Sequence, residues 1–107
     1  SDWLEIGPLE AIPPLGSRVV RTTFGDIAVF RTRDDRVFAV RDRCPHLGGP
    51  LSQGIVHGHA VTCPLHNWNI DLTTGEVAAP DEGCVAQFPV RVEGDVVYLS
   101  LTGAAPQ

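Results

Sequence analysis

The hydrophobic pattern along the chain is that of short β-strands separated by turns. Apolar and polar residues alternate, or β-branched residues cluster, in brief runs that Gly, Pro, Asp and Asn interrupt. No segment sustains the 3.6-residue apolar period of an amphipathic helix. The pattern predicts an all-β fold in one domain, 1–107. The predicted strands are residues 3–6, 17–23, 27–31, 37–40, 54–56, 60–62, 69–71, 76–78, 88–92 and 96–101.

Turn residues predict how these strands connect. Residues 17–40 are expected to form a three-stranded antiparallel meander, with a glycine turn at 24–26. The run His57-Gly58-His59 predicts a tight hairpin between the strands on either side of it. Further hairpins are expected within 69–78 and across Glu93-Gly94-Asp95, and the small, polar tail 102–107 is expected to be frayed.

Charge and composition narrow the classes of partner. The net charge is −5, with eight Arg, no Lys and 13 acidic residues, which argues against nucleic acid as a partner. Residues 18–43 carry +3, whereas 44–68 contain no Asp, Glu, Lys or Arg but all four histidines. No run of eighteen apolar residues is present, so we expect a soluble, cytoplasmic protein that does not bind a membrane. An uncharged segment rich in ligand-type residues suggests a cofactor near an apolar docking surface.

Two short motifs carry metal-binding residue types. Cys44 and His46 form a C-x-H motif, and Cys63 and His66 form a C-x-x-H motif. A structural zinc site usually draws like ligands from each turn, whereas here each motif offers one thiolate and one imidazole. Cys44 and His46 are spaced to reach two different atoms of a binuclear cluster. If both motifs do so, the cysteines hold one iron and the histidines the other, which is the ligand set of a Rieske [2Fe-2S] centre. A zinc site remains the alternative.

The two motifs in full, C-P-H-L-G-G-P-L and C-P-L-H-N-W, resemble the Rieske iron–sulfur signature. The resemblance implies a Rieske-type antiparallel β-sandwich or barrel with a small loop-rich cluster-binding subdomain, about 43–68. It implies that Cys44 and Cys63 bind the buried iron, and that His46 and His66 bind the outer iron at the tip of the protein.

Residues around these ligands bear on the properties of the cluster. The resemblance implies that Gly48 and Gly49 let the backbone approach the sulfides and that Trp68 is a further cofactor-binding residue. Rieske proteins of respiratory complexes carry a disulfide beside the cluster, but Gly49 and Leu65 occupy those positions here. Trp68 and Ile70 stand where that type has hydroxyl donors. Fewer donors stabilise the reduced cluster less, so we predict a midpoint potential toward the low end of the Rieske span, roughly −150 to +300 mV.

Residues 2–101 resemble the small subunit of the cytoplasmic NAD(P)H-dependent assimilatory nitrite reductase. The resemblance rests on residues 27–32, 37–46, 48–58, 63–68 and 80–84. It implies an electron-transfer subunit of an oxidoreductase, without a substrate site of its own. Its partner would be a large subunit that holds sirohaem and FAD and reduces nitrite to ammonium. The alternatives are a Rieske ferredoxin serving a ring-hydroxylating dioxygenase and its flavin reductase, and a cluster-free or zinc-bound structural module.

Three residues of ligand type remain outside this assignment. Cys84 is expected to be a half-buried small hydrophobe, or else to lie near the cofactor or a dimer contact. His57 and His59 are expected to be exposed and solvated in a hairpin turn, with a proton relay or a partner contact as the alternative.

Overall fold

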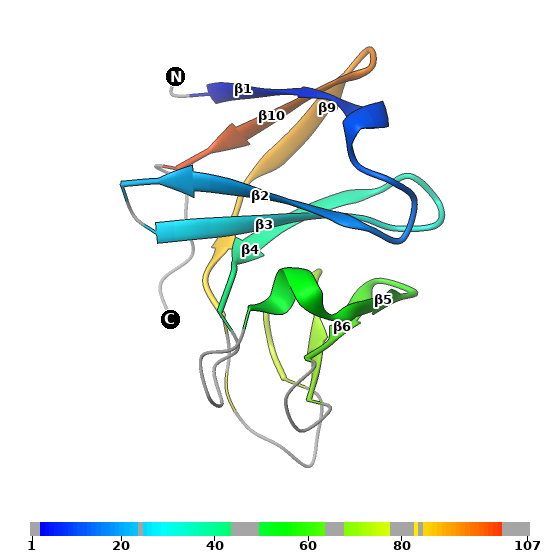
Figure 1. The fold of residues 1–107 in the computed structure, drawn as a ribbon, viewed down its shortest axis with the longest axis vertical. Helices are drawn as coiled ribbons and strands as arrows, with labels where there is room; N and C mark the ends of the chain where they lie inside the picture. Colours follow the sequence, from blue (N-terminus) through cyan, green and yellow to red (C-terminus); the bar gives the residue numbers. More distant parts are fainter. Residues whose placement is uncertain are drawn as a thin grey trace.

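The computed structural model describes residues 3–23, 25–43, 50–63, 68–77, 83 and 85–101. Within these ranges the chain forms strands and two short 3-10 turns, η1 and η2, in the order that Figure 1 shows. The elements are β1 Trp3–Pro8, η1 Leu9–Ala11, β2 Ser17–Thr22, β3 Gly25–Arg31, β4 Val37–Arg41, η2 Leu51–Gln53, β5 Ile55–His57, β6 Ala60–Thr62, β7 Asn69–Asp71, β8 Gln87–Phe88, β9 Val90–Glu93 and β10 Val96–Ser100.

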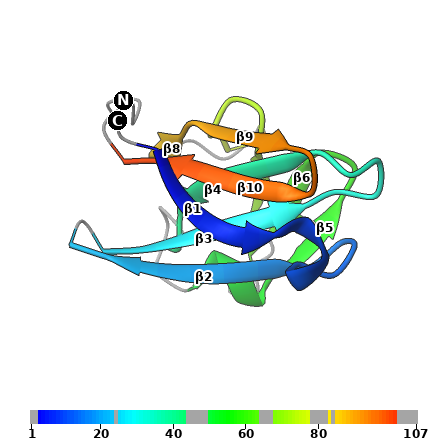
Figure 2. The same cartoon turned by 90° about the horizontal axis from the view of Figure 1, so that it is seen from above.

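The strands form three antiparallel sheets, in the orders β1-β10-β9, β2-β3-β4-β8 and β5-β6-β7. Figure 1 shows them as successive layers, with β2-β3-β4 in the middle, and Figure 2 shows the β1-β10-β9 sheet lying over it. This arrangement confirms the all-β antiparallel prediction. The predicted meander is present as β2-β3-β4, and β8 adds a fourth strand to it.

The central strand β3 is buried on both faces, which its uninterrupted apolar run Ile27-Ala-Val-Phe30 explains. Ile27 and Val29 point into the cluster between the middle sheet and the β1-β10-β9 sheet, together with Val97 and Leu99 of β10. Ala28 and Phe30 point the other way, into a second cluster. That cluster joins the middle sheet to the small sheet, and its other members are Val40, Leu51, Val56, Val61, Cys63, Ile70, Leu72, Val77 and Val85.

Three predicted elements differ from those observed. The predicted strand 88–92 is divided at Pro89, which has no N–H to give to a ladder, so β8 pairs with β4 and β9 with β10. Of the predicted strand 76–78, the described residues Glu76 and Val77 form isolated bridges rather than a strand, and Val77 pairs with Ile70. The first strand is longer than predicted because β1 continues through a bulge between Glu5 and Gly7.

The two predicted tight turns are confirmed where the chain is described. Gly58 has a φ of 56° between β5 and β6, and Gly94 has a φ of 61° between β9 and β10. The expectations for Phe24 and the tail 102–107 fall outside the described residues. None of the helical segments seen in the described ranges is long and apolar enough to cross a membrane.

Candidate metal centre

A set of hydrogen bonds, which we call the first stem, joins the two ends of the segment that contains Cys44 and His46. Asp42 follows β4, and its carboxylate oxygens accept bonds from Ser52 N at 2.6 Å and Ser52 Oγ at 2.8 Å. Ser52 lies in η2, and its carbonyl accepts a bond from Ser17 Oγ of β2 at 2.9 Å. The carboxylate therefore satisfies a backbone N–H at the start of η2, where no helical carbonyl is available. The first stem anchors this segment to the middle sheet.

The second stem is the pair Cys63 and Trp68, which closes the segment that contains His66. In the pairing of strands β6 and β7, Thr62 lies opposite Asn69. The next residues toward the connecting segment continue the ladder, because Cys63 N donates to Trp68 O at 2.7 Å. Thr62 Oγ1 also donates to Asn69 Oδ1 at 2.5 Å across the same end of the hairpin. Cys63 is fully buried, and half-buried Trp68 packs against the apolar cluster that contains it. A short, well-paired hairpin thus delivers Cys63 to the core.

The two stems meet in the same part of the molecule. Gly54, which follows η2, lies so close to Thr62 that a Cβ on it would overlap the Thr62 carbonyl oxygen. Leu51 of η2 and Cys63 belong to the same buried cluster. The chain of contacts from Asp42 through Ser52 and Gly54 therefore ends beside Cys63. The structure brings the anchors of both motifs together, although the motifs are separated in sequence.

Among the predicted site residues, the structure places Cys63 and Trp68. Cys44, His46, Gly48, Gly49, His66 and also Cys84 fall outside the described residues, so their ligand and packing roles stay predictions. Ile70, which stands at a hydroxyl-donor position of the respiratory type, is fully buried in the apolar cluster.

His57 is exposed, as expected, but it has a polar partner. Its Nε2 lies 2.7 Å from Thr62 Oγ1. The Thr62 hydroxyl donates to Asn69 Oδ1, so its oxygen can accept the Nε2 proton of His57 in the tautomer that carries one. The three side chains form a ladder across β5, β6 and β7, next to the second stem.

His59 differs from the solvated side chain that the sequence suggested. It is 35% exposed, and its Nε2 lies 3.0 Å from Asp34 Oδ2 in the β3–β4 turn. Its ring also lies 5.5 Å from that of Phe38. The contact joins the small sheet to the middle sheet, because His59 sits in the β5–β6 turn.

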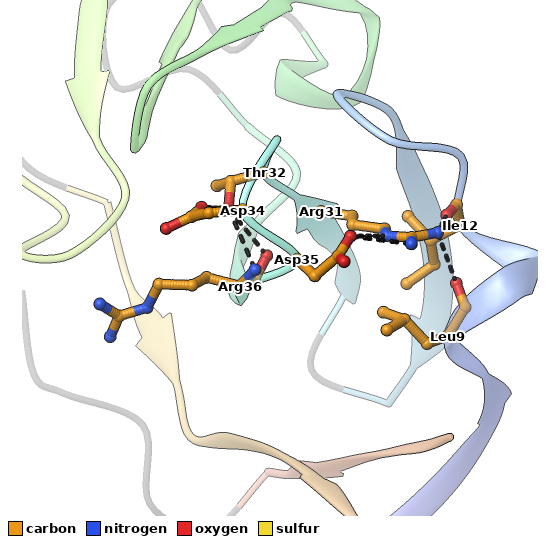
Figure 3. A network of polar contacts seen from close by, with 7 residues as sticks. All are labelled: Leu9, Ile12, Arg31, Thr32, Asp34, Asp35 and Arg36. Atoms are coloured by element: carbon orange, nitrogen blue, oxygen red, sulfur yellow. Dashed lines mark hydrogen bonds and ion pairs between the residues drawn. The ribbon is translucent and has the colours of Figure 1, made fainter. Parts of the chain in front are cut away.

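The β3–β4 turn that receives His59 is itself held by side chains, as Figure 3 shows. The hydroxyl of Thr32 donates to Asp34 and accepts a bond from Arg36 N at 3.1 Å. Arg31 bonds Asp35 on one side and the Ile12 carbonyl on the other, at 2.8 and 2.9 Å. The hydrogen bond from Thr32 is the main cause that lowers the pKa of Asp34 below its ordinary value of 3.8, and the bond from His59 adds to it.

Sequence reasoning missed Asp42, Ser52 and the Asp34–His59 contact. The sequence places Asp42 two residues before Cys44, but no pattern in it indicates that Asp42 pairs with Ser52, ten residues later. Asp42 and Ser52 hold the two ends of the first motif segment, whereas the Asp34–His59 contact joins the small sheet to the middle sheet.

Comparison with known proteins identifies what the chain is similar to. Residues 2–89 match the Rieske [2Fe-2S] domain family. The chain is 35% identical to the ferredoxin subunit of 3-phenylpropionate/cinnamic acid dioxygenase from Photorhabdus laumondii, over 88% of this chain and 90% of that protein. It is 43% identical to 4beta-methylsterol monooxygenase from Methylococcus capsulatus over 82% of this chain, but it spans only 27% of that protein.

Solved structures of Rieske proteins have the same fold as this chain. The ferredoxin seen in complex with the oxygenase of carbazole 1,9a-dioxygenase is 28% identical, with a TM-score of 0.81 over 92% of each chain. A structure described as a nitrite reductase NADPH small subunit is 25% identical, with a TM-score of 0.81 over 92% of this chain and 98% of that one. The fold alone therefore does not separate the two kinds of redox system.

Proposed function

Because the chain belongs to the Rieske [2Fe-2S] domain family, and so is an electron-transfer protein with a Rieske-type cluster, we propose that it is the ferredoxin component of a ring-hydroxylating oxygenase system. The observation that carries the proposal is the 35% identity to a dioxygenase ferredoxin subunit, with about nine-tenths of both chains covered. In this role the chain takes an electron from a flavin reductase and gives it to the oxygenase. The sequence resemblance alone had favoured the nitrite reductase small subunit.

The residues of the chain suit such a carrier. A bound [2Fe-2S] cluster supplies reversible one-electron transfer, and Cys44, Cys63, His46 and His66 would hold it. Cys63 is fully buried among apolar side chains, and its backbone N–H is fixed by the Trp68 carbonyl. Such a place holds a thiolate ligand in one position and keeps water from it. The thiolates of this donor set suit iron–sulfur clusters.

A nitrite reductase small subunit is the second candidate. The observation in its favour is the solved structure at 25% identity that matches 98% of its own length. The partner would then be the large subunit with sirohaem and FAD. A third arrangement, in which the chain is the Rieske part of a longer oxygenase, is suggested by the methylsterol monooxygenase, of which it spans 27%.

The cluster and its ligands are tested first, on the purified protein. We expect reddish-brown protein with a dithionite-reducible Rieske-type EPR signal. The substitution His66→Ala should abolish that signal, whereas the matched control His57→Ala, in the exposed β5–β6 hairpin, should keep it. Retention of the signal in His66→Ala would refute the ligand assignment.

The partner is tested next, with two defined redox systems. A dioxygenase flavin reductase with NADH should reduce the cluster rapidly without forming a stable complex, and its oxygenase should reoxidise it. A stable complex that co-purifies with a sirohaem protein would instead establish the nitrite reductase alternative. A mononuclear iron site that co-purifies on the same polypeptide would establish the third arrangement.

A further inference from the structure

The Thr62 hydroxyl lies at the loop end of the β6–β7 hairpin, where the segment that contains His66 begins. Thr62 and Asn69 are directly opposite each other in the strand register, and Thr62 Oγ1 donates to Asn69 Oδ1 at 2.5 Å. Cys63 follows Thr62 in the chain and Trp68 precedes Asn69, so this side-chain bond closes the hairpin next to the second stem. We call it the Thr62–Asn69 rung.

The rung and the apolar core hold this end of the hairpin from opposite faces. Successive side chains of a strand alternate between the faces of a sheet, so Thr62 points away from the core that receives Cys63. Half-buried Trp68 packs against the same core. Between the two faces, Cys63 N donates to Trp68 O at 2.7 Å. The last backbone pair before the ligand segment therefore has side-chain contacts on both faces.

Three strands of the small sheet meet at Thr62. His57 Nε2 of β5 lies 2.7 Å from the Thr62 hydroxyl oxygen, so the hydroxyl has a polar contact in each of the two neighbouring strands. Threonine is β-branched and its χ1 angle has few rotamers. Two contacts and a stiff side chain thus leave the hydroxyl little freedom to turn away from Asn69.

The place of the rung is more important than its contribution to the global fold. The hydrogen bond is exposed, and such a bond adds modestly to the free energy of unfolding. Buried residues such as Val61 and Ile70 hold the small sheet as a whole. Local opening, however, starts where few contacts have to break, as at the end of a short hairpin. Opening at this end would separate Cys63 from Trp68 and displace the thiolate that is predicted to bind iron.

We propose that the Thr62 hydroxyl is a positioning group for the iron–sulfur cluster. It acts through Asn69 and the backbone pair of the second stem, which together fix the direction in which Cys63 presents its thiolate. Groups that orient metal ligands from outside the coordination sphere tune the affinity and the redox properties of a site. A ligand held in this way needs little rearrangement when the cluster gains or loses an electron. The inference rests on the proposed ligand role of Cys63.

Three variants of the holoprotein test the rung. Thr62→Val replaces the hydroxyl by a methyl group of similar size, and Thr62→Ser keeps the hydroxyl. Thr73→Val is the matched control, because Thr73 Oγ1 also donates at 2.5 Å, to Asp71 Oδ1, in the exposed turn that follows the other end of β7. The two measurements are the rate of iron loss into a chelator and the line widths of the Rieske-type EPR spectrum of the reduced protein.

Thr62→Val should lose iron about fivefold faster than wild type, the factor that corresponds to one hydrogen bond of ordinary strength. Its EPR lines should be broader, since a less fixed ligand takes a wider range of positions. Valine and threonine both favour strands, so the urea midpoint should change little. Thr62→Ser and Thr73→Val should stay close to wild type in both measurements.

The acceptor of the rung is tested separately by Asn69→Ala. Because Thr62→Val and Asn69→Ala remove the same bond, the double variant should lose iron no faster than the faster single variant. A rate increase equal to the product of the two single effects, or EPR lines in Thr62→Val as narrow as in Thr73→Val, would overturn the positioning role and leave the electron-transfer function standing. A wild-type protein without any Rieske signal would overturn the function itself.

Discussion

Removal of the Asp42 carboxylate tests whether the first stem fixes the segment that holds Cys44 and His46. In Asp42→Ala, Ser52 N and Ser52 Oγ both lose their acceptor, at 2.6 and 2.8 Å. A hydrogen bond to a charged group contributes about 1.5–3 kcal/mol, and both residues are half-buried, so the lower end applies to each bond. We therefore expect a loss of about 2–4 kcal/mol in the free energy of unfolding.

The effect on the cofactor should exceed the effect on the global fold. Without the bonds to Asp42, one end of the segment from residue 43 to 51 is held by η2 through its buried Leu51. Its local opening becomes more frequent by the factor that corresponds to the lost free energy, about 30-fold at 2 kcal/mol. Loss of iron from the holoprotein into a chelator should accelerate by a similar factor, and this rate is the primary measurement.

Three further variants separate geometry from charge. Asp42→Asn can still accept from Ser52 N and donate to Ser52 Oγ, so it should lose iron more slowly than Asp42→Ala. Ser52→Ala removes one of the two bonds and should fall between wild type and Asp42→Ala. Asp95→Ala removes an exposed carboxylate in the β9–β10 turn and should match wild type. Equal iron-loss rates and equal urea midpoints for Asp42→Ala and Asp95→Ala would refute the stem.

Other predictions concern packing, titration and potential. Gly54→Ala places a Cβ against the Thr62 carbonyl and should destabilise the holoprotein by about 1–3 kcal/mol in urea unfolding, whereas Gly58→Ala, where no atom lies within 4 Å, should cost about 1 kcal/mol. Thr32→Val leaves the backbone N–H of Arg36 without its acceptor in a part-buried hydrogen bond, which should cost about 1 kcal/mol in the free energy of unfolding. The same change removes the main cause of the lowered Asp34 pKa, so an NMR titration should show that pKa rising toward 3.8. Because the pKa of Asp34 is lowered in the folded state, its carboxylate stabilises the protein above pH 3.8, and this stabilisation is lost as the pH falls through the acid range. The free energy of unfolding of Thr32→Val should therefore fall less on acidification than that of the wild type. A redox titration should give a midpoint below about +100 mV, and a higher value would refute the donor argument.

The elements that the sequence predicted well are those whose signals are local. Gly58 and Gly94 mark their hairpins because a positive φ at a tight turn favours glycine, and the strands on either side follow from apolar runs. The pairing of β1 with β10 joins the two ends of the chain and has no local signal. The division at Pro89 was predictable in principle, since a proline cannot donate to a ladder.

The candidate site divides in the same way. The ligand types and their spacing in the two motifs are local, and they led to the family that the comparison then identified. The first stem is not local, because Asp42 and Ser52 are ordinary surface-type residues whose meeting depends on how η2 packs under β2 and β3. Likewise, nothing in the sequence around His59 points to Asp34, which lies in another turn.

Burial of β3 on both faces explains why these distant contacts form together. Ala28 and Phe30 pack against the cluster that also holds Leu51 and Cys63, while the alternate residues of the same strand pack toward β10. Because both cores share one strand, η2 and the end of β6 cannot shift without disturbing the middle sheet, whose interior is close-packed. An electron carrier benefits from this rigidity, since a metal site whose anchors move little needs little rearrangement when its charge changes. The hydrogen bonds of the two stems should therefore stay the same when the cluster is reduced or oxidised. Equal amide exchange rates at Ser52 N and Cys63 N in the two redox states would show this directly.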